Sequence, residues 1–311
     1  MTNSILAEST AVGSLIGLAV GDALGAPVEF CERGSFDEIH GMRAGGRFKL
    51  PAGAWTDDTA MALCLAHSLC ERSEFDEQDL LLRFCHWVER ADWTSTGKCV
   101  GIGQNTLMAL GNFRRTGALQ APPNGQKSDG NGSIMRLAPV AIFSWRNVPR
   151  ARDIARRQSL ATHHSAIAAV CSEYLVEIIC ALICGHPWRE ACDIASNAQT
   201  KPLDVMDELC LSTLCHKDRS EIRASGYCLD ALKAALWAVE TTTSFQEALL
   251  KAVNLGEDAD TVGAIAGQLA GARYGYHAIP ADWLKVLKRR DDIVTLAQKV
   301  FAKGREITVE C

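Results

Sequence analysis

The chain has 311 residues, of which 48% are hydrophobic and 22% are charged, so it is long enough to bury a large core. A net charge of −5, without any run of basic residues, argues against a nucleic-acid-binding protein. The 13 cysteines are odd in number and form no CxxC pair, which predicts reduced thiols in a cytoplasmic protein and neither a disulfide framework nor a zinc site.

The first strongly apolar segment covers residues 12–26 and has the hydropathy of a signal peptide. No Lys or Arg precedes it, whereas a signal peptide begins with basic residues. Asp22 interrupts the segment, which is also too short to cross a bilayer. We therefore expect a soluble protein without a membrane partner.

The periodic segments along the chain are nearly all helical in spacing, because apolar residues recur every three to four positions. The sequence contains no long alternating strand, no internal repeat and no low-complexity linker. We predict a single all-α domain over residues 1–311. The expected helices cover residues 12–24, 59–69, 79–90, 105–113, 164–184, 227–240, 245–253, 261–274 and 293–302.

Two of these helices carry glycine at every fourth position. The two stripes are Gly13, Gly17, Gly21 and Gly25, and Gly263, Gly267, Gly271 and Gly275. Glycine inside a helix costs about 1 kcal/mol relative to alanine, and close approach of two backbones is the usual gain that offsets this cost. We predict that the stripes pack on each other or on equally tight neighbours. Gly25 and Gly275, near helix ends, could instead serve only as helix stops.

Two acid-rich motifs, far apart in the sequence, each stand directly before an apolar helix. Their oxygen-bearing side chains are Thr56, Asp57, Asp58, Asp258, Asp260 and Thr261. Thr and Asp are also common helix N-caps, and acids in a first turn complement the helix dipole. A cap needs only one oxygen, however, and each motif offers at least three. If the two helix starts meet, the crowded charges need cations, and an all-oxygen set suits Mg²⁺ or Mn²⁺.

Two further acids lie at the end of the first helix. Glu29 follows the stop signals Gly25 and Pro27 and has apolar neighbours, an unusual setting for an acid unless something binds it or it forms a structural salt bridge. Asp22 lies inside the helix, where we expect a structural acid whose oxygens accept hydrogen bonds from backbone groups.

Two glycine-containing loops precede helices at residues 95–103 and 128–136. Exposed backbone amides in such loops can bind phosphate, although a plain turn has the same composition. His163 stands just before the helix expected at residues 164–184, where it could stack on a ligand or have no role.

Taken together, these motifs resemble the ADP-ribosylglycohydrolase family, over residues 14–284 and in the order of the family. The matching motifs are residues 21–25 with Glu29, 55–59, 130–132 with 135–136, 162–163, and 256–263. The resemblance implies an all-α, orthogonally packed helical domain that holds two Mg²⁺ or Mn²⁺ ions. It also implies hydrolysis of the bond between C1″ of ADP-ribose and a modified protein side chain, often arginine and in other branches serine.

The resemblance further implies roles for individual residues. Glu29, Asp57 and Asp258 are the expected catalytic residues, and Glu29 would act as the acid–base group or would position the water. The implied metal ligands are Thr56, Asp57, Asp58, Asp258, Asp260 and Thr261. The implied substrate-binding residues are Gly97, Lys98, Cys99, Gly101, Ser128, Asp129, Gly130, Asn131 and His163. The expected partner is an ADP-ribosylated protein, together with the ADP-ribosyltransferase or toxin that modifies it.

One loop departs from the arginine-directed bacterial members of the family, which carry an acid near the position of Gly101. The loop here, residues 99–103, contains no acid. Asp92 or Asp129 could replace it, so the linked side chain stays open between arginine and serine at this point.

Two other functions are compatible with the same residues. An immunity-type binding protein could occlude an ADP-ribosylating toxin with or without turnover, although an intact ligand set argues against a degenerate site. A two-metal phosphoesterase could use the same acids. Its product would be AMP, whereas cleavage of the glycosidic bond releases free ADP-ribose.

Overall fold

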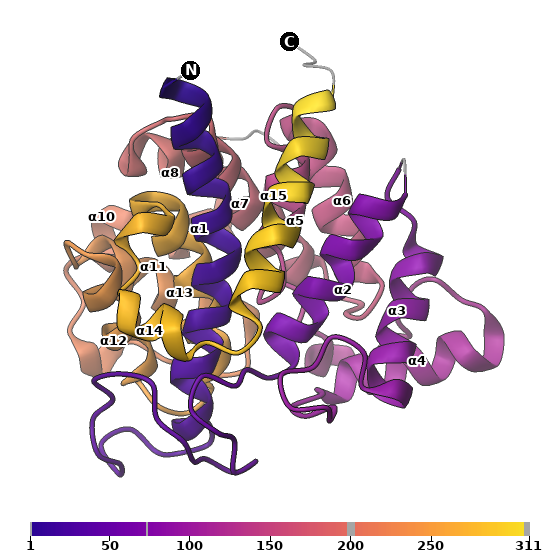
Figure 1. The fold of residues 1–311 in the computed structure, drawn as a ribbon, viewed down its shortest axis with the longest axis horizontal. Coiled ribbons are helices and arrows are strands. Elements are labelled where there is room, and N and C mark those ends of the chain that lie inside the picture. The colour runs from indigo at the N-terminus through magenta and orange to yellow at the C-terminus, as the bar shows by residue number, and fades with distance from the viewer. Residues whose placement is uncertain (1, 73, 198–202, 308–311) are drawn as a thin grey trace.

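The computed structural model describes residues 2–72, 74–197 and 203–307. Within these residues the secondary structure is helical, with two isolated β-bridges and no strand, so the all-α prediction is confirmed. Figure 1 shows the helices gathered around the long helix α1 (Thr2–Gly25). The other α-helices are α2 (Asp57–Glu71), α3 (Glu77–Arg90), α4 (Gln104–Thr116), α5 (Ala138–Ser144), α6 (Val148–Leu160), α7 (Ala166–Ile183), α8 (Trp188–Ser196), α9 (Leu203–Glu208), α10 (Leu211–Leu214), α11 (Cys228–Glu240), α12 (Phe245–Val253), α13 (Ala259–Tyr274), α14 (Ala281–Val286) and α15 (Arg290–Glu306).

Helices α1 and α13 are the two glycine-striped helices, and they pack antiparallel with their backbones in contact. A Cβ atom added at Gly17 would lie 2.1 Å from the carbonyl oxygen of Gly267, and one added at Gly21 would lie 1.9 Å from that of Gly263. The prediction that the stripes pack on each other is therefore confirmed. Gly25 belongs to the same interface, because its added Cβ would meet the backbone of Ala259 at 2.2 Å.

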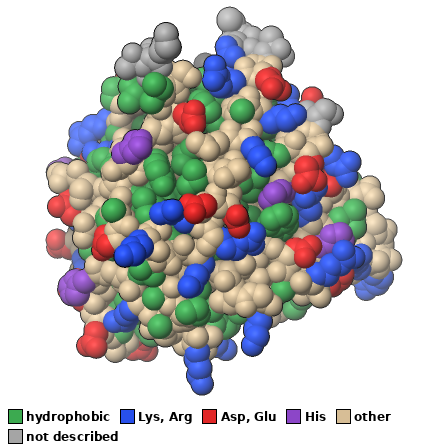
Figure 2. All heavy atoms as spheres, in the orientation of Figure 1, with side chains coloured by type: hydrophobic (Ala, Val, Ile, Leu, Met, Phe, Trp, Pro, Cys, Tyr) green, Lys and Arg blue, Asp and Glu red, His purple; other side chains and the backbone are tan. Residues whose placement is uncertain are grey.

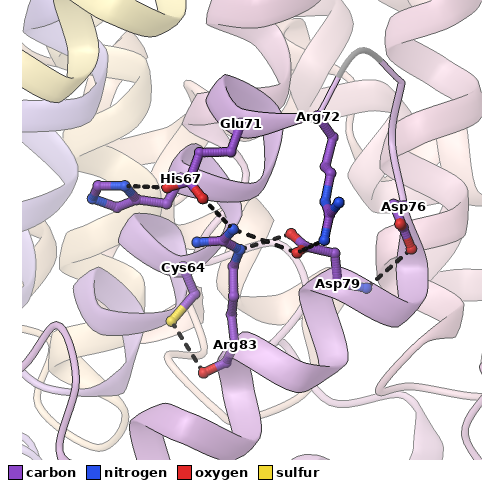
Figure 3. Close-up of polar contacts among 7 residues, drawn as sticks. All are labelled: Cys64, His67, Glu71, Arg72, Asp76, Asp79 and Arg83. Atoms are coloured by element: carbon purple, nitrogen blue, oxygen red, sulfur yellow. Dashed lines mark hydrogen bonds and ion pairs between the residues drawn. The ribbon is translucent and has the colours of Figure 1, made fainter.

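Helix α2 carries two site acids in its first turn, and an ion-pair network fixes its far end against α3 (Figure 3). Arg83 of α3 donates hydrogen bonds to Glu71 of α2 and to Asp79, each at 2.7 Å, and Arg72 donates to Asp79 at 2.8 Å. Burial opposes ionisation of Asp79, but the bonds from Arg83 and Arg72 outweigh it and lower its pKa to about 2. The network thus fixes the C-terminal end of α2, and the site acids lie at the opposite end of the same helix.

Several helix boundaries differ from the sequence prediction. Helix α1 begins at Thr2, ten residues earlier than expected, because the polar residues before the apolar segment continue the helix. Helix α7 begins at Ala166 and not at residue 164, since the Ser165 side chain accepts a hydrogen bond from the Ala168 amide and caps the helix. Helices α6, α8, α9, α10 and α14 were not predicted, because they are short or, in α6, mostly polar, and α5 was predicted only as the helix that follows the loop at residues 128–136.

Two helices are long and apolar enough to cross a bilayer by those measures alone, at residues 4–28 and Ala166–Ile183. Within the protein, 94% and 89% of these segments are buried, as expected for core helices of a globular protein. The face in Figure 2 shows acidic and basic side chains interspersed with hydrophobic ones.

Candidate active site

The end of α1 and the starts of α2 and α13 meet at one end of the molecule, near the irregular segment that follows α1 at the lower edge of Figure 1. The hydroxyl oxygen of Thr56, before α2, lies 3.2 Å from Asp58 Oδ2 and 3.4 Å from Oδ2 of Asp260, in the first turn of α13. The predicted convergence of two motifs some 200 residues apart in sequence is therefore confirmed.

The carboxylates at this junction form two groups, in each of which three oxygens lie within 4.8 Å of one another. The groups are Asp22, Asp58 and Asp260, and Glu29, Asp258 and Asp260. Asp260 belongs to both, so the groups are contiguous. Neither N-cap residue, Thr56 or Asp258, makes a capping hydrogen bond through its side chain. Helix capping therefore does not account for these oxygens.

Asp22 is fully buried and accepts hydrogen bonds from both the amide and the hydroxyl of Thr56 and of Thr59, at 2.6–3.1 Å. Its predicted role as a structural acid is confirmed. Its membership of the acid cluster was not predicted, because nothing in the apolar sequence of α1 indicates which helix starts lie against its end.

The donor set fits a hard divalent cation. The Asp58 Oδ1 and Glu29 Oε2 oxygens are buried and have no hydrogen-bond partner among the residues that the structure describes. Burial, followed by repulsion from Asp57, raises the pKa of Glu29 to about 8, and burial with repulsion from Asp22 raises that of Asp57 to about 7. Bound cations would offset the burial of these acids and the repulsion between them, because they supply positive charge to carboxylate oxygens that have no hydrogen-bond donor.

A cavity of about 730 Å³ opens above the acids, within the size range of pockets for cofactor-sized ligands. Ten of the sequence-predicted site residues line it: Glu29, Asp57, Cys99, Gly101, Gly130, Asn131, His163, Asp258, Asp260 and Thr261. The other predicted residues, which do not line it, are Thr56, Asp58, Gly97, Lys98, Ser128 and Asp129. Of these, Thr56 and Asp58 lie in the acid cluster beneath the cavity.

The two glycine-containing loops form opposite walls and contact the acids directly. A Cβ atom at Gly101, whose φ is +88°, would lie 2.1 Å from Asp57 Oδ1, so only glycine fits there. On the other wall, the Asn131 side-chain amide donates to Asp258 Oδ2 at 2.6 Å. The first loop therefore packs against Asp57, and the second holds Asp258 through a hydrogen bond.

His163 lies against the wall formed by Gly130 and Gly132. Burial, aided by the charge of Arg136, lowers the pKa of His163 to about 3. Arg136 donates to the Thr162 hydroxyl at 2.8 Å, and that hydroxyl lies 2.8 Å from His163 Nδ1. The Thr162 hydroxyl, which accepts from Arg136, can donate its own hydrogen to Nδ1, and in that arrangement His163 carries its hydrogen on Nε2.

Neither acid considered as a partner for a substrate guanidinium, Asp92 or Asp129, lines the cavity. Asp129 instead accepts a hydrogen bond from Ser165, at the start of α7. Three residues that do line it, Phe30, Arg47 and Phe48, were not identified from the sequence, because no motif contains them.

Comparisons with known proteins agree with this geometry. The family model described as ADP-ribosylglycohydrolase matches residues 3–308. An ADP-ribosylarginine hydrolase Tri1 from Serratia proteamaculans is 38% identical over 298 residues, covering 95% of this chain and 80% of the relative. An ADP-ribosyl-[dinitrogen reductase] glycohydrolase from Rhodospirillum rubrum is 31% identical over 281 residues, covering 89% and 90%. A solved structure, an ADP-ribosylglycohydrolase-related protein complex, superposes with a TM-score of 0.80 at 37% identity, covering 96% of this chain and 99% of that one.

Proposed function

Because this chain belongs to the ADP-ribosylglycohydrolase family, we propose that it hydrolyses the C1″ glycosidic bond that joins ADP-ribose to an arginine side chain of a modified protein. The observation that carries the proposal is the pair of carboxylate groups that share Asp260 at the floor of a ligand-sized cavity. The choice of arginine is supported by the name of the Serratia relative, an ADP-ribosylarginine hydrolase.

The acid cluster would hold two Mg²⁺ or Mn²⁺ ions. Asp58 would serve one ion, Glu29 and Asp258 the other, and Asp260 both, while Asp22 would hold Thr56 beside the first. Thr56, Asp57 and Thr261 adjoin this cluster and remain proposed ligands through their side-chain oxygens. A bound divalent cation supplies Lewis acidity and fixed positive charge near the reacting sugar.

The protein's own groups would perform the proton transfers. Cleavage forms a bond between water oxygen and C1″, breaks the bond from C1″ to the guanidine nitrogen, and passes an oxocarbenium-like state. Glu29, which lines the cavity and whose Oε2 has no hydrogen-bond partner among the described residues, is placed to accept a proton from the attacking water or to donate one to the leaving nitrogen. Asp258, which Asn131 holds, and Asp57, against which Gly101 packs, would orient the sugar.

The remainder of ADP-ribose would lie along the loop walls. Cys99, Gly101, Gly130 and Asn131 offer backbone and amide groups to the diphosphate and ribose, and His163 offers its Nε2 hydrogen. Such contacts provide binding energy remote from the reacting carbon. The other proposed binding residues are Gly97, Lys98, Ser128 and Asp129. They do not line the cavity, so they would contribute by shaping the loops that do.

The substrate chemistry also indicates the setting. An ADP-ribosyltransferase, endogenous or a toxin, must install the group that this enzyme removes. The cysteines that the structure describes are free thiols, which is consistent with the reducing cytoplasm where such modification and its reversal would take place.

Mass spectrometry of the products tests the proposal. An ADP-ribosyl-arginine peptide incubated with the protein and Mg²⁺ or Mn²⁺ should yield free ADP-ribose and unmodified peptide, and EDTA should stop the reaction. An ADP-ribosyl-serine peptide, treated in parallel, reports the linkage preference. Release of AMP would instead indicate cleavage of the diphosphate, and no product with either peptide and either metal would refute the proposed activity.

A further inference from the structure

An aromatic side chain stands at the mouth of the cavity with a guanidinium resting on it. Phe30 is 57% exposed, and its ring meets that of Phe48 edge to face with centroids 6.5 Å apart. The guanidinium carbon of Arg47 lies 4.9 Å from the centroid of the Phe30 ring. All three residues line the same cavity as Glu29. An exposed aromatic ring that binds a guanidinium thus forms part of the candidate active site.

The backbone explains how Phe30 reaches this position beside Glu29. Adjacent residues of an extended chain point to opposite sides, but Phe30 has a φ of +66°, a conformation that L side chains rarely adopt. Its amide donates to the Glu257 carbonyl at 2.6 Å, and the Glu257 amide donates to the Cys31 carbonyl at 2.7 Å. These bonds tie the turn to the loop that carries Asp258. The strained turn brings both Glu29 and Phe30 to the cavity.

Among the residues that line the cavity, no carboxylate apart from those of the acid cluster and its neighbours is available to a substrate guanidinium. The lining acids are Glu29, Asp57, Asp258 and Asp260, all of which belong to or adjoin the cluster at its floor. Arg47 itself makes no ion pair with any residue that the structure describes, so the Phe30 ring is its observed partner. A cation at the mouth of this cavity therefore has the face of an aromatic ring as its available contact.

We propose that the Phe30 ring is the platform on which the guanidinium of the modified arginine rests, and that Arg47 covers this platform in the free protein. The proposal rests on the proposed function, because it concerns the leaving group of that reaction. The guanidinium is bonded directly to C1″, so it must lie next to Glu29, and Phe30 is the neighbouring residue. A planar cation binds favourably over a phenyl face even when no acid is nearby. This agrees with the loop at residues 99–103, which contains no acid.

Binding measurements separate this role from catalysis. Chelator-treated protein is titrated calorimetrically with ADP-ribosyl-arginine and with ADP-ribose, which lacks the guanidinium. The Phe30→Leu variant should weaken binding of ADP-ribosyl-arginine by about five- to tenfold and leave ADP-ribose unchanged. Phe30→Tyr keeps the aromatic face and should retain the wild-type affinity for both. Unchanged binding of ADP-ribosyl-arginine by Phe30→Leu, or an equal loss for both ligands, would overturn the platform.

The Arg47→Met variant tests the covering contact. Removal of the internal guanidinium should leave ADP-ribose binding unchanged and should tighten ADP-ribosyl-arginine binding, because the substrate no longer competes for the ring. A loss of affinity for both ligands would overturn the covering role and would assign Arg47 to the ADP-ribose itself. If wild-type protein with metal releases no ADP-ribose, the proposed function fails, yet the ratio of the two affinities still decides whether Phe30 recognises a guanidinium.

Discussion

The backbone contact between α1 and α13 predicts a large penalty for one added methyl group. In Gly17→Ala the new Cβ would lie 2.1 Å from the Gly267 carbonyl oxygen and 3.2 Å from the Phe245 ring. The obstacle is backbone, so the two helices must separate by about 1 Å to restore an ordinary contact. Overpacking of this kind costs about 3 kcal/mol, and the helix preference of alanine returns about 1 kcal/mol. We therefore expect a net loss of about 2 kcal/mol.

Urea denaturation followed by far-UV circular dichroism measures this loss, and Gly111→Ala provides the matched control. Gly111 lies within α4, and a Cβ atom added there meets nothing within 4 Å. The control should gain about 1 kcal/mol from helix propensity alone, so the two variants should differ by about 3 kcal/mol. If Gly17→Ala were as stable as Gly111→Ala, the close approach of the two helices would be refuted.

Three further predictions concern the site. In metal-free protein, burial raises the pKa of Asp57 from 3.8 to about 7 and that of Glu29 from 4.5 to about 8. The folded protein therefore binds these protons more tightly than the unfolded chain, and the stability that they contribute is present below about pH 4 and is lost as pH rises through 7 to 8. The melting temperature should therefore fall between pH 5 and pH 8 and recover at pH 8 with Mg²⁺; a flat profile would contradict the clustering of these acids. Asp260→Asn should keep the helical circular dichroism spectrum but lose Mn²⁺ binding and at least about a hundredfold in hydrolysis rate, and wild-type turnover would rule out a shared ligand. Gly101→Ala should abolish hydrolysis because its Cβ would collide with Asp57, whereas Gly34→Ala, with a similar positive φ but open space and a position outside the cavity, should retain it; equal activities would show that the contact is unimportant.

The helical class and the pairing of the glycine stripes could be predicted because both depend on local sequence patterns. Apolar spacing marks most of the long helices, and repeated glycine inside a helix implies a close partner wherever that partner lies. Helix α6 (Val148–Leu160) was missed because its sequence is rich in Arg and its apolar face is narrow. The single domain over residues 1–311 remains a prediction, supported by the continuous core that runs from α1 to α15.

Parts of the site depend on tertiary structure and could not be predicted. The over-supplied helix starts at Thr56 and Asp258 indicated an oxygen cluster, but the contribution of Asp22 depends on which helix starts pack against the end of α1. Phe30 was not identified from the sequence because a positive φ is expected of glycine and not of phenylalanine. Here two hydrogen bonds with the Glu257 segment hold the backbone of the turn in that conformation. The contacts that select both residues join segments more than 30 residues apart.

A Mn²⁺-soaked crystal, measured at a wavelength where manganese scatters anomalously, tests the central claim most directly. We predict two anomalous peaks, one between Asp58 and Asp260 and one between Glu29, Asp258 and Asp260. A crystal without anomalous density among these carboxylates, under conditions in which the protein releases ADP-ribose, would contradict the account.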